Sequence, residues 1–335
     1  MRLFFILIAI IFFSQRLTAG EAYLTLLGAR NEGEHIFETG NMHPNLSGIR
    51  GGSRITYNRD YNFGGLEFGY LFGKQMLSLG FRTTGWNINP GNSRDEDFVF
   101  PTVRGSDVSL SRELGSKFSL GEGKFYDTAH TYSGTINFAD GHTRSAMSEY
   151  ALHLQWRYYF GEATPFTPKS QFFLSSGVYY SYFKYYLYDV VQYINSRPIF
   201  YGPIGNGLSY AHSYTELPLG LGYAIRLNQW TIEPSVEMMA VFNRFRDFHV
   251  QRALNFIGTQ SGPGFRFRLA LSYLIGTSGV LKVTYHAHRQ FTRGQFETRG
   301  GLSTDDILSN FLGNFNSYVS TKQAGLEFSY SHKLF

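Results

Sequence analysis

The stretch WTIEPSVEMMAVF at residues 230–242 combines strand-forming residues with a period of two. Even positions carry apolar side chains such as Ile232 and Phe242, whereas odd positions begin with polar ones such as Glu233 and Glu237. Successive side chains of a β-strand point to opposite faces, so this stretch predicts a strand with one apolar and one polar face.

The same period recurs along the chain. Residues 265–275 alternate apolar side chains with Arg266 and Arg268, and residues 281–288 repeat the pattern. This repeated two-residue period predicts an all-β protein. The pattern predicts ten strands, at residues 21–36, 53–71, 76–88, 145–160, 170–190, 208–226, 229–246, 263–276, 279–293 and 318–334.

The predicted connections alternate in length. Short connections fall at 72–75, 161–169, 227–228 and 277–278, and long ones at 37–52, 89–144, 191–207, 247–262 and 294–317. An even number of strands with short turns at one end and long loops at the other is typical of transmembrane barrels. We therefore predict a ten-stranded antiparallel transmembrane β-barrel of a bacterial outer membrane, with short periplasmic turns and long extracellular loops.

The N-terminus predicts export. Residues 1–19 combine a basic start, an apolar run of about a dozen residues and a small-residue exit, as in a secretory signal peptide. The run is too short for a membrane-spanning helix, which needs roughly 20 residues. Residues 20–335 show no linker and are expected to form a single barrel domain.

The composition narrows the function. The chain has no cysteine, which excludes disulfides and a thiol nucleophile. A formal net charge of +5, including two arginines of the expected signal peptide, is too small to indicate nucleic-acid binding. The 24 tyrosines and 32 phenylalanines are expected mainly in aromatic girdles at the bilayer interfaces.

Two acidic motifs stand out at the start of two predicted outer loops. One is Asp95-Glu96-Asp97, and the other is Asp247-Phe248-His249. In an extended chain, side chains at i and i+2 face the same way, so Asp247 and His249 should share the face of Glu237 and point into the barrel. A carboxylate beside a histidine can orient the imidazole as a general base. Because no Ser or Cys nucleophile is near, water is the expected attacker.

The chain resembles the omptins, a family of ten-stranded outer-membrane endopeptidases. The resemblance covers the expected mature chain and rests on Asp95-Glu96-Asp97-Phe98 and Asp247-Phe248-His249 in matching loops, with support from residues 79–86 and 324–326. It implies a catalytic site in which Asp95 and His249 flank a water molecule, Asp97 supports the water and Asp247 orients His249.

This chain also departs from the pattern of the family. The acid of the family's pocket for basic residues would lie two positions before Asp247, where this chain has Phe245, and Glu34 is a loose match for a second pocket acid. The resemblance implies lipopolysaccharide as a requirement for activity, with Lys184 and Arg157 as candidate contacts. No other cofactor is expected.

Other functions compete with a peptidase. The barrel could serve as a non-enzymatic adhesin or receptor, or as a small porin. His286-x-His288 could hold a metal, but without a third ligand the pair more simply adds polarity to the lumen, so no metal site is expected. The expected partners are outer-membrane lipid, lipopolysaccharide and a peptide or host-protein substrate, with no nucleic acid, and the chain is expected to be a monomer.

Overall fold

A computed structural model describes residues 20–40, 49–85, 89–101, 136–161, 170–194, 197–201, 206–311 and 315–334. The predicted signal peptide lies outside these residues. The elements are β1 (Glu21–Gly40), β2 (Ile49–Asn58), β3 (Tyr61–Phe72), β4 (Gln75–Thr83), β5 (Asn89–Pro101), β6 (Ile136–Tyr159), β7 (Gln171–Ile194), β8 (Arg197–Tyr201), β9 (Asn206–Leu227), β10 (Trp230–His249), β11 (Leu254–Ile275), β12 (Gly279–Gly300), α3 (Thr304–Ser309) and β13 (Phe315–Lys333). Within the described part of the chain, no helix has the length and apolar character needed to cross a membrane.

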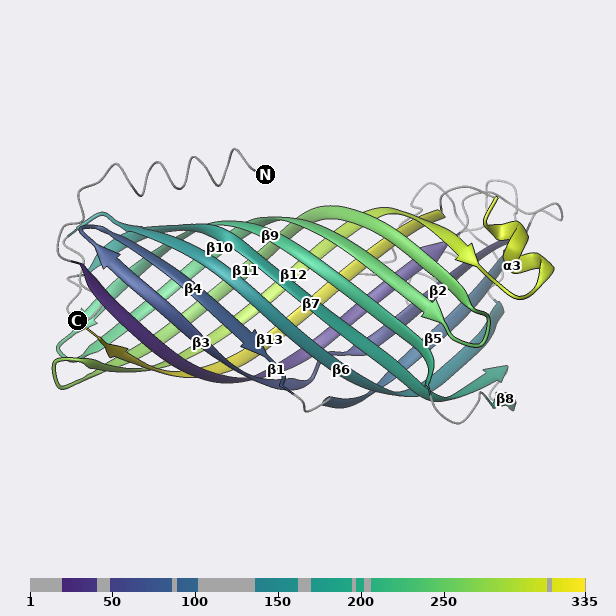
Figure 1. Ribbon diagram of the computed structural model, residues 1–335, viewed down its shortest axis with the longest axis horizontal. Coiled ribbons are helices and arrows are strands. Elements are labelled where there is room, and N and C mark those ends of the chain that lie inside the picture. Colours follow the sequence, from purple (N-terminus) through teal and green to yellow (C-terminus); the bar gives the residue numbers. More distant parts are fainter. Residues whose placement is uncertain are drawn as a thin grey trace.

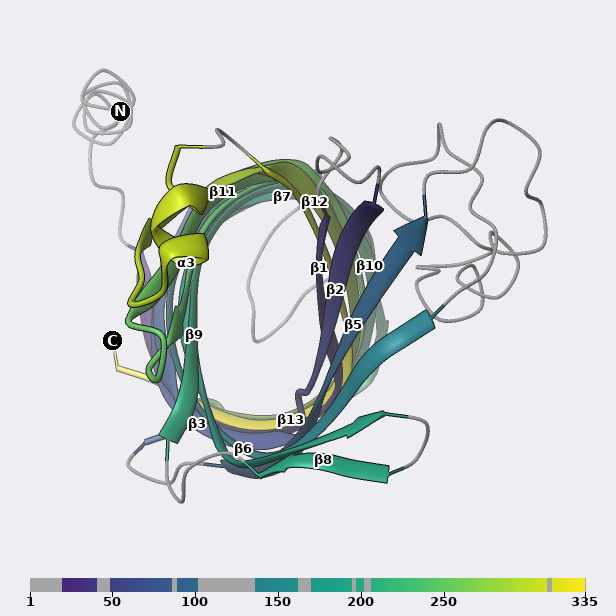
Figure 2. The ribbon, with the colours of Figure 1, turned by 90° about the vertical axis from the view of Figure 1, so that its right-hand side faces the viewer.

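The strands form one sheet that closes on itself (Figure 1). Ten of them make a ring in the order β6, β4, β3, β1, β13, β12, β11, β10, β9 and β7, and the pairing of β7 with β6 completes it. Figure 2 shows these strands arranged around a common axis. Every pair in the ring is antiparallel, so the prediction of an all-β antiparallel fold is confirmed.

The two ends of the ring differ. Glu21 and Lys333 meet at one end, where Lys333 Nζ lies 2.6 Å from Glu21 Oε1, and we call this end the base. Turns of two or three residues connect strands at the base, at 73–74, 228–229 and 276–278. We call the opposite end the rim, where β2, β5, β8 and α3 lie (Figure 1).

One predicted strand is interrupted, and another ends early. The predicted strand 53–71 is divided between β2 and β3, whereas the predicted strand 76–88 contains most of β4, and β5 begins beyond its end. β2 takes over the pairing with β1 on the rim side of β3, and β5 takes over the pairing with β6 on the rim side of β4. β2 and β3 therefore follow one path along the wall of the ring, and β4 and β5 follow the next.

The strands also extend further toward the rim than predicted. The predicted loop 89–144 contains β5 and the start of β6, the loop 247–262 contains the first half of β11, and the loop 191–207 contains β8. The alternation of apolar and polar residues ends where the outer face becomes polar. Backbone pairing continues beyond that point because it satisfies every N–H and C=O group whatever side chains flank it.

The outer face carries a belt of exposed apolar side chains on the base side of the ring. In β10, for example, Met238 is 65% exposed although it lies in the middle of a strand. The belt includes Leu26, Phe68, Leu79, Leu152, Leu219, Val236, Phe242, Phe267, Val283 and Phe328. On the rim side of Phe242, the outward positions of β10 become cationic, at Arg244 and Arg246.

The inner face is polar at the level of the belt. Glu237 accepts hydrogen bonds from Arg266 Nη1 at 3.0 Å and from Arg268 Nη1 at 3.2 Å, and Arg266 Nη2 also donates to Glu216 at 2.5 Å. The Glu237 side chain is 2% exposed. These charges are therefore compensated by one another inside the ring.

Glu237 should be the most sensitive member of this network. We expect Glu237→Ala to lower the free energy of unfolding by about 3–5 kcal/mol, because it leaves two largely buried guanidinium groups without their shared carboxylate. Denaturant unfolding of the protein in lipid vesicles measures this loss. Glu32→Ala, which removes an exposed acid 3.7 Å from Arg30, should cost well under about 1 kcal/mol. Equal effects of the two substitutions would contradict the assignment.

Candidate active site at the rim

Asp247 and His249 lie at the rim end of β10. Their side chains point into the ring, as do those of Glu237, Asn243 and Phe245 at the other odd positions of β10, and this orientation was predicted. His249 Nε2 lies 3.2 Å from Asp247 Oδ2, so His249 can donate a hydrogen bond to this carboxylate and keep Nδ1 free to take a proton. The Asp247 side chain is 4% exposed and that of His249 is 26% exposed. The pair is therefore anchored inside while the imidazole reaches solvent.

Asp95 reaches the same region from the far wall of the ring. It lies in β5, in a strand rather than in the predicted loop, and Asp95 Oδ1 accepts a hydrogen bond from Ser53 Oγ at 3.1 Å. Its neighbour Ser93 is buried whereas Arg94 is exposed, which places Asp95 on the inner face. Asp97 lies two residues further along β5, paired with Ser53 in backbone register, and its side chain lies outside the described part.

The charges of both acids act on His249. Burial lowers the pKa of the His249 imidazole, but the Asp247 carboxylate and the more distant Asp95 carboxylate outweigh this effect, and Arg252 opposes them. The net pKa of His249 is raised above its ordinary value. Asp95 therefore contributes to the electrostatic environment of His249.

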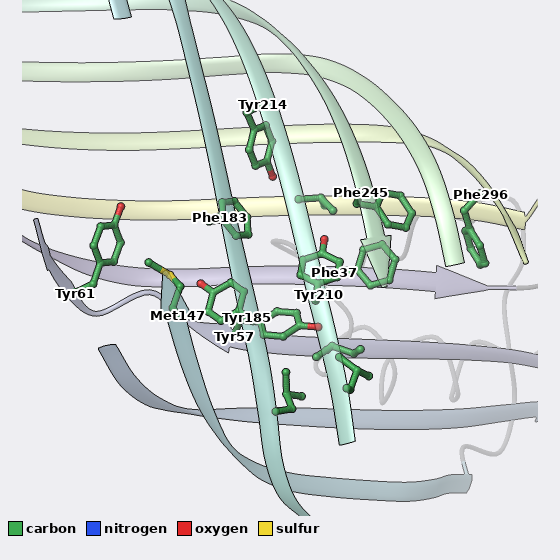
Figure 3. Packing of buried hydrophobic residues seen from close by; sticks show 14 of the residues in the cluster. Phe37, Tyr57, Tyr61, Met147, Phe183, Tyr185, Tyr210, Tyr214, Phe245 and Phe296 are labelled. Atoms are coloured by element: carbon green, nitrogen blue, oxygen red, sulfur yellow. The ribbon is translucent and has the colours of Figure 1, made fainter. Parts of the chain in front are cut away.

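Stacked tyrosines form a floor under this site. Tyr57 of β2 stacks on Tyr210 of β9 with ring centroids 4.9 Å apart, and on Tyr185 of β7 at 4.5 Å (Figure 3). Tyr210 pairs with Asp247 in backbone register, and Tyr57 lies one inward position below the level of Asp95. The stack thus spans the lumen beneath both acids.

The floor belongs to a larger apolar group, here called the upper cluster. Its members come from nine strands around the ring, and they fill the lumen on the rim side (Figure 3). They are Phe37, Ile55, Tyr57, Tyr61, Met147, Phe183, Tyr185, Leu187, Leu208, Tyr210, Tyr214, Met239, Val241, Phe245, Phe296 and Val319. Many aromatic residues therefore pack inside the ring, and the expectation that they serve mainly as girdles is wrong for this group.

Two histidines are enclosed in the same layer. His35 Nε2 lies 3.1 Å from Tyr210 Oη and His35 Nδ1 lies 2.9 Å from Thr321 Oγ1, while His212 Nδ1 lies 3.4 Å from Tyr210 Oη. Burial lowers the pKa of both imidazoles well below the ordinary value, with further lowering by Arg59. Both are therefore neutral at physiological pH and act as polar links within the floor. The sequence pattern gave no signal for them, because each is an isolated histidine in a strand.

The remaining predicted site residues do not join this site. Glu34 is exposed on the outer face, opposite Lys322 in register. Lys184 also faces outward, over the Tyr186 ring at 4.5 Å. Arg157 instead faces the lumen near the base, 5.1 Å from the Phe173 ring centroid, where it cannot contact lipid phosphates.

A polar cavity lies below the floor. It has a volume of about 210 Å³, and its lining includes Arg82, Arg157, Lys282, His286 and His288. A second apolar group closes the base beneath it and consists of Tyr23, Leu71, Tyr159 and Phe173. His286 and His288 thus add polarity to the lumen, and the described residues contain no group of three potential metal ligands.

Comparison with solved structures defines the class of fold. The chain is similar to the outer membrane protease OmpT from Escherichia coli, with a TM-score of 0.57, 10% sequence identity and coverage of 92% of this chain and 96% of that chain. At this identity the similarity shows a shared fold. The outer membrane protein OprG from Pseudomonas aeruginosa, with 10% identity and coverage of 94% and 96%, gives a TM-score of only 0.34.

The family follows from the sequence. A family model described as "Putative porin" matches residues 42–328, and the chain belongs to this family. No curated protein matches the sequence. The family and the shared fold together indicate an outer-membrane β-barrel.

The electrostatic link between Asp95 and His249 can be tested directly. We expect Asp95→Asn to lower the pKa of His249, because it removes a carboxylate that stabilises the imidazolium. An NMR titration of the histidine ring protons in detergent micelles, assigned with His249→Ala, measures the shift. Glu34→Gln removes an acid from the outer face and should leave this pKa unchanged. An unchanged pKa in Asp95→Asn would show that the two groups lie too far apart to cooperate.

Proposed function

We propose that the chain is an omptin-type endopeptidase of the bacterial outer membrane. The observation that supports this most is the Asp247–His249 pair at the tyrosine floor, where the charge of Asp95 also raises the pKa of His249. The fold shared with an outer membrane protease is consistent with this activity. The matching positions of the two short acidic motifs add to it.

The apolar belt sets the orientation in this proposal. A large exposed apolar band on a closed sheet is the surface that a bilayer covers. The base, with its short turns and both strand ends, then lies in the periplasm, and the rim projects from the cell. The candidate site would lie above the membrane, where it can meet peptides and host proteins.

The proposed chemistry is hydrolysis by an activated water. Asp95 and His249 hold the water, and Asp97 supports it. As the water oxygen attacks the carbonyl carbon of the peptide, one water proton passes to the free nitrogen of His249. Asp247 stabilises the imidazolium that forms. When the C–N bond breaks, the imidazolium returns the proton to the leaving amine, and His249 is regenerated.

Lipopolysaccharide remains a proposed partner, with a revised set of contacts. Lys184 lies in one row with Ala211 and Arg246 across β7, β9 and β10, on the outer face just above the belt. Arg244 lies next to this row. We propose that Lys184, Arg244 and Arg246 contact lipid phosphates, because this height matches the headgroup region. Arg157 has no part in this contact.

Replacement of the base should abolish cleavage. We expect His249→Ala to lower kcat by at least about 10³-fold, because general-base catalysis contributes on the order of 10²–10⁴-fold. The measurement is cleavage of a broad peptide library by the lipopolysaccharide-supplemented protein. Arg299→Ala, at an exposed rim position beside Glu297, serves as the matched control and should cleave normally. Binding to host matrix with no cleavage by the wild type would instead favour an adhesin.

The activity should depend on pH through His249. The imidazole must be neutral to accept a proton, and its pKa is raised, so kcat should increase as the pH rises through a value above 6.5. In a variant that retains activity, loss of the Asp95 charge should move this rise to lower pH. A pH–rate profile of the wild type and Asp95→Asn measures both effects. A rate independent of pH between 5 and 9 would exclude His249 as the base.

A second candidate function is passage of small solutes. The family supports it, as does the polar cavity in the lumen. The upper cluster and the base group occupy the lumen on either side of this cavity, so passage would require them to move. A ten-stranded ring is also narrow, since aqueous channels are known from barrels of 16–18 strands.

The two functions predict different conductance. The wild type should give only small steps in a planar lipid bilayer, because stacked side chains cross the lumen. The double substitution Tyr57→Ala and Tyr210→Ala should increase the step size, since it removes the rings that span the floor. Tyr150→Ala, on the outer face against Tyr182, is the control and should change nothing. Large, stable steps in the wild type would favour the porin.

A further inference from the structure

Four aromatic rings form a continuous row beside the proposed site, here called the aromatic ladder. The His249 and Phe256 ring centroids lie 4.9 Å apart. Phe256 and Phe296 follow at 5.8 Å, and Phe296 and Phe315 at 5.2 Å. The ladder therefore leads from the imidazole along the inner wall formed by β10, β11, β12 and β13.

Two members of the ladder are only partly buried. Phe256 and Phe315 pack against the upper cluster but keep part of their surface open, whereas Phe296 is 6% exposed. A half-open aromatic surface inside a polar rim can bind an apolar side chain, because water is displaced from both partners. The Phe256 ring lies directly beside His249.

The wall below the ladder is also apolar. Phe245 contacts Phe37 with ring centroids 4.8 Å apart and is 1% exposed. It holds the position two residues before Asp247, so this part of the wall is buried aromatic carbon and carries no carboxylate. Glu34, the other acid considered for this pocket, faces the outer surface.

The ladder itself carries no carboxylate. Arg252, whose charge opposes the rise in the pKa of His249, makes an ion pair with Asp306 of α3, so this charge is compensated. A lysine or arginine of the substrate would therefore find no ion-pair partner among the four rings, whereas an apolar side chain would find aromatic carbon.

We propose that this site is specific for peptides with a large apolar side chain, aromatic or branched aliphatic, next to the bond that is cut. Phe256 and Phe315 hold this side chain, and His249 lies at the end of the ladder where the bond is placed. The proposal rests on the proposed peptidase function. It assigns to Phe256 the role of a specificity-determining residue.

The test uses one family of peptides that differ at a single position. Peptides with Phe, Leu, Ala, Lys or Glu next to the cut bond are incubated with the full-length protein in lipopolysaccharide-containing vesicles, and kcat/KM is measured for each. We expect Phe and Leu to exceed Lys on the order of 100-fold, as apolar pockets discriminate. Phe256→Ala should lower kcat/KM about tenfold more for the Phe peptide than for the Ala peptide. Preference for Lys would overturn the proposal.

A matched control separates specificity from stability. Phe291→Ala makes the same change on the outer face of β12, where the ring contacts Arg289 at 4.6 Å. It should leave the order of the five peptides unchanged. If Phe291→Ala shifts the preference as much as Phe256→Ala does, the ladder does not set specificity.

Binding separates this proposal from the peptidase function. Fluorescent forms of the five peptides are titrated against Asp95→Asn, which lacks one of the two groups proposed to hold the water, with and without Phe256→Ala. Binding that favours Phe and Leu and depends on Phe256 supports the ladder, even if the wild type cuts no peptide, in which case only the peptidase function fails. The proposal is overturned if the affinity does not depend on the side chain of the peptide, or if Phe256→Ala leaves the affinity unchanged.

Discussion

Closure of the sheet is the constraint on which the rest of the structure depends. Once β7 pairs with β6, no strand of the ring has a free edge, and every second side chain must enter a narrow interior. Side chains fill most of that interior. The chain fills it in layers, with apolar rings at the rim side, paired charges at the level of the belt and a second apolar group at the base.

The layers separate two environments that one channel would have joined. Above the floor, the His249 imidazole is in contact with solvent and its partner Asp247 is buried, while the Tyr57–Tyr210 stack limits water from below. Below the floor, charges such as Glu237 and Arg266 neutralise one another within the cavity wall. The floor therefore lowers the dielectric on one side of the imidazole, which makes the nearby carboxylates more effective than they would be in water.

Many strands, and the faces on which their side chains lie, could be predicted from the two-residue period of the sequence, but only where one face of the strand is apolar. The strand predicted at 229–246 is close to β10, and the inward orientation of Asp247 and His249 followed from that of Glu237.

The break between β2 and β3 was not predictable. Arg59 is buried at this break, and its guanidinium donates a hydrogen bond to Glu149 of β6 at 2.7 Å, a partner 90 residues away. The upper cluster was also missed, because in β7 both faces around Tyr185 are aromatic and the pattern does not show which face is inside. The approach of Asp95 to His249 depends on strand order, which no local motif encodes.

The pairing of β1 with β13 has a consequence for biogenesis. The first and last strands of the ring join along a register that runs from Tyr23 opposite Lys333 to Gly40 opposite Asn316. The wall therefore cannot close until β13 has been synthesised. A chain that lacks β13 presents two long unpaired edges, on β1 and β12, that can join to other chains. A premature stop at β13 would thus be as damaging as one in the middle of the chain.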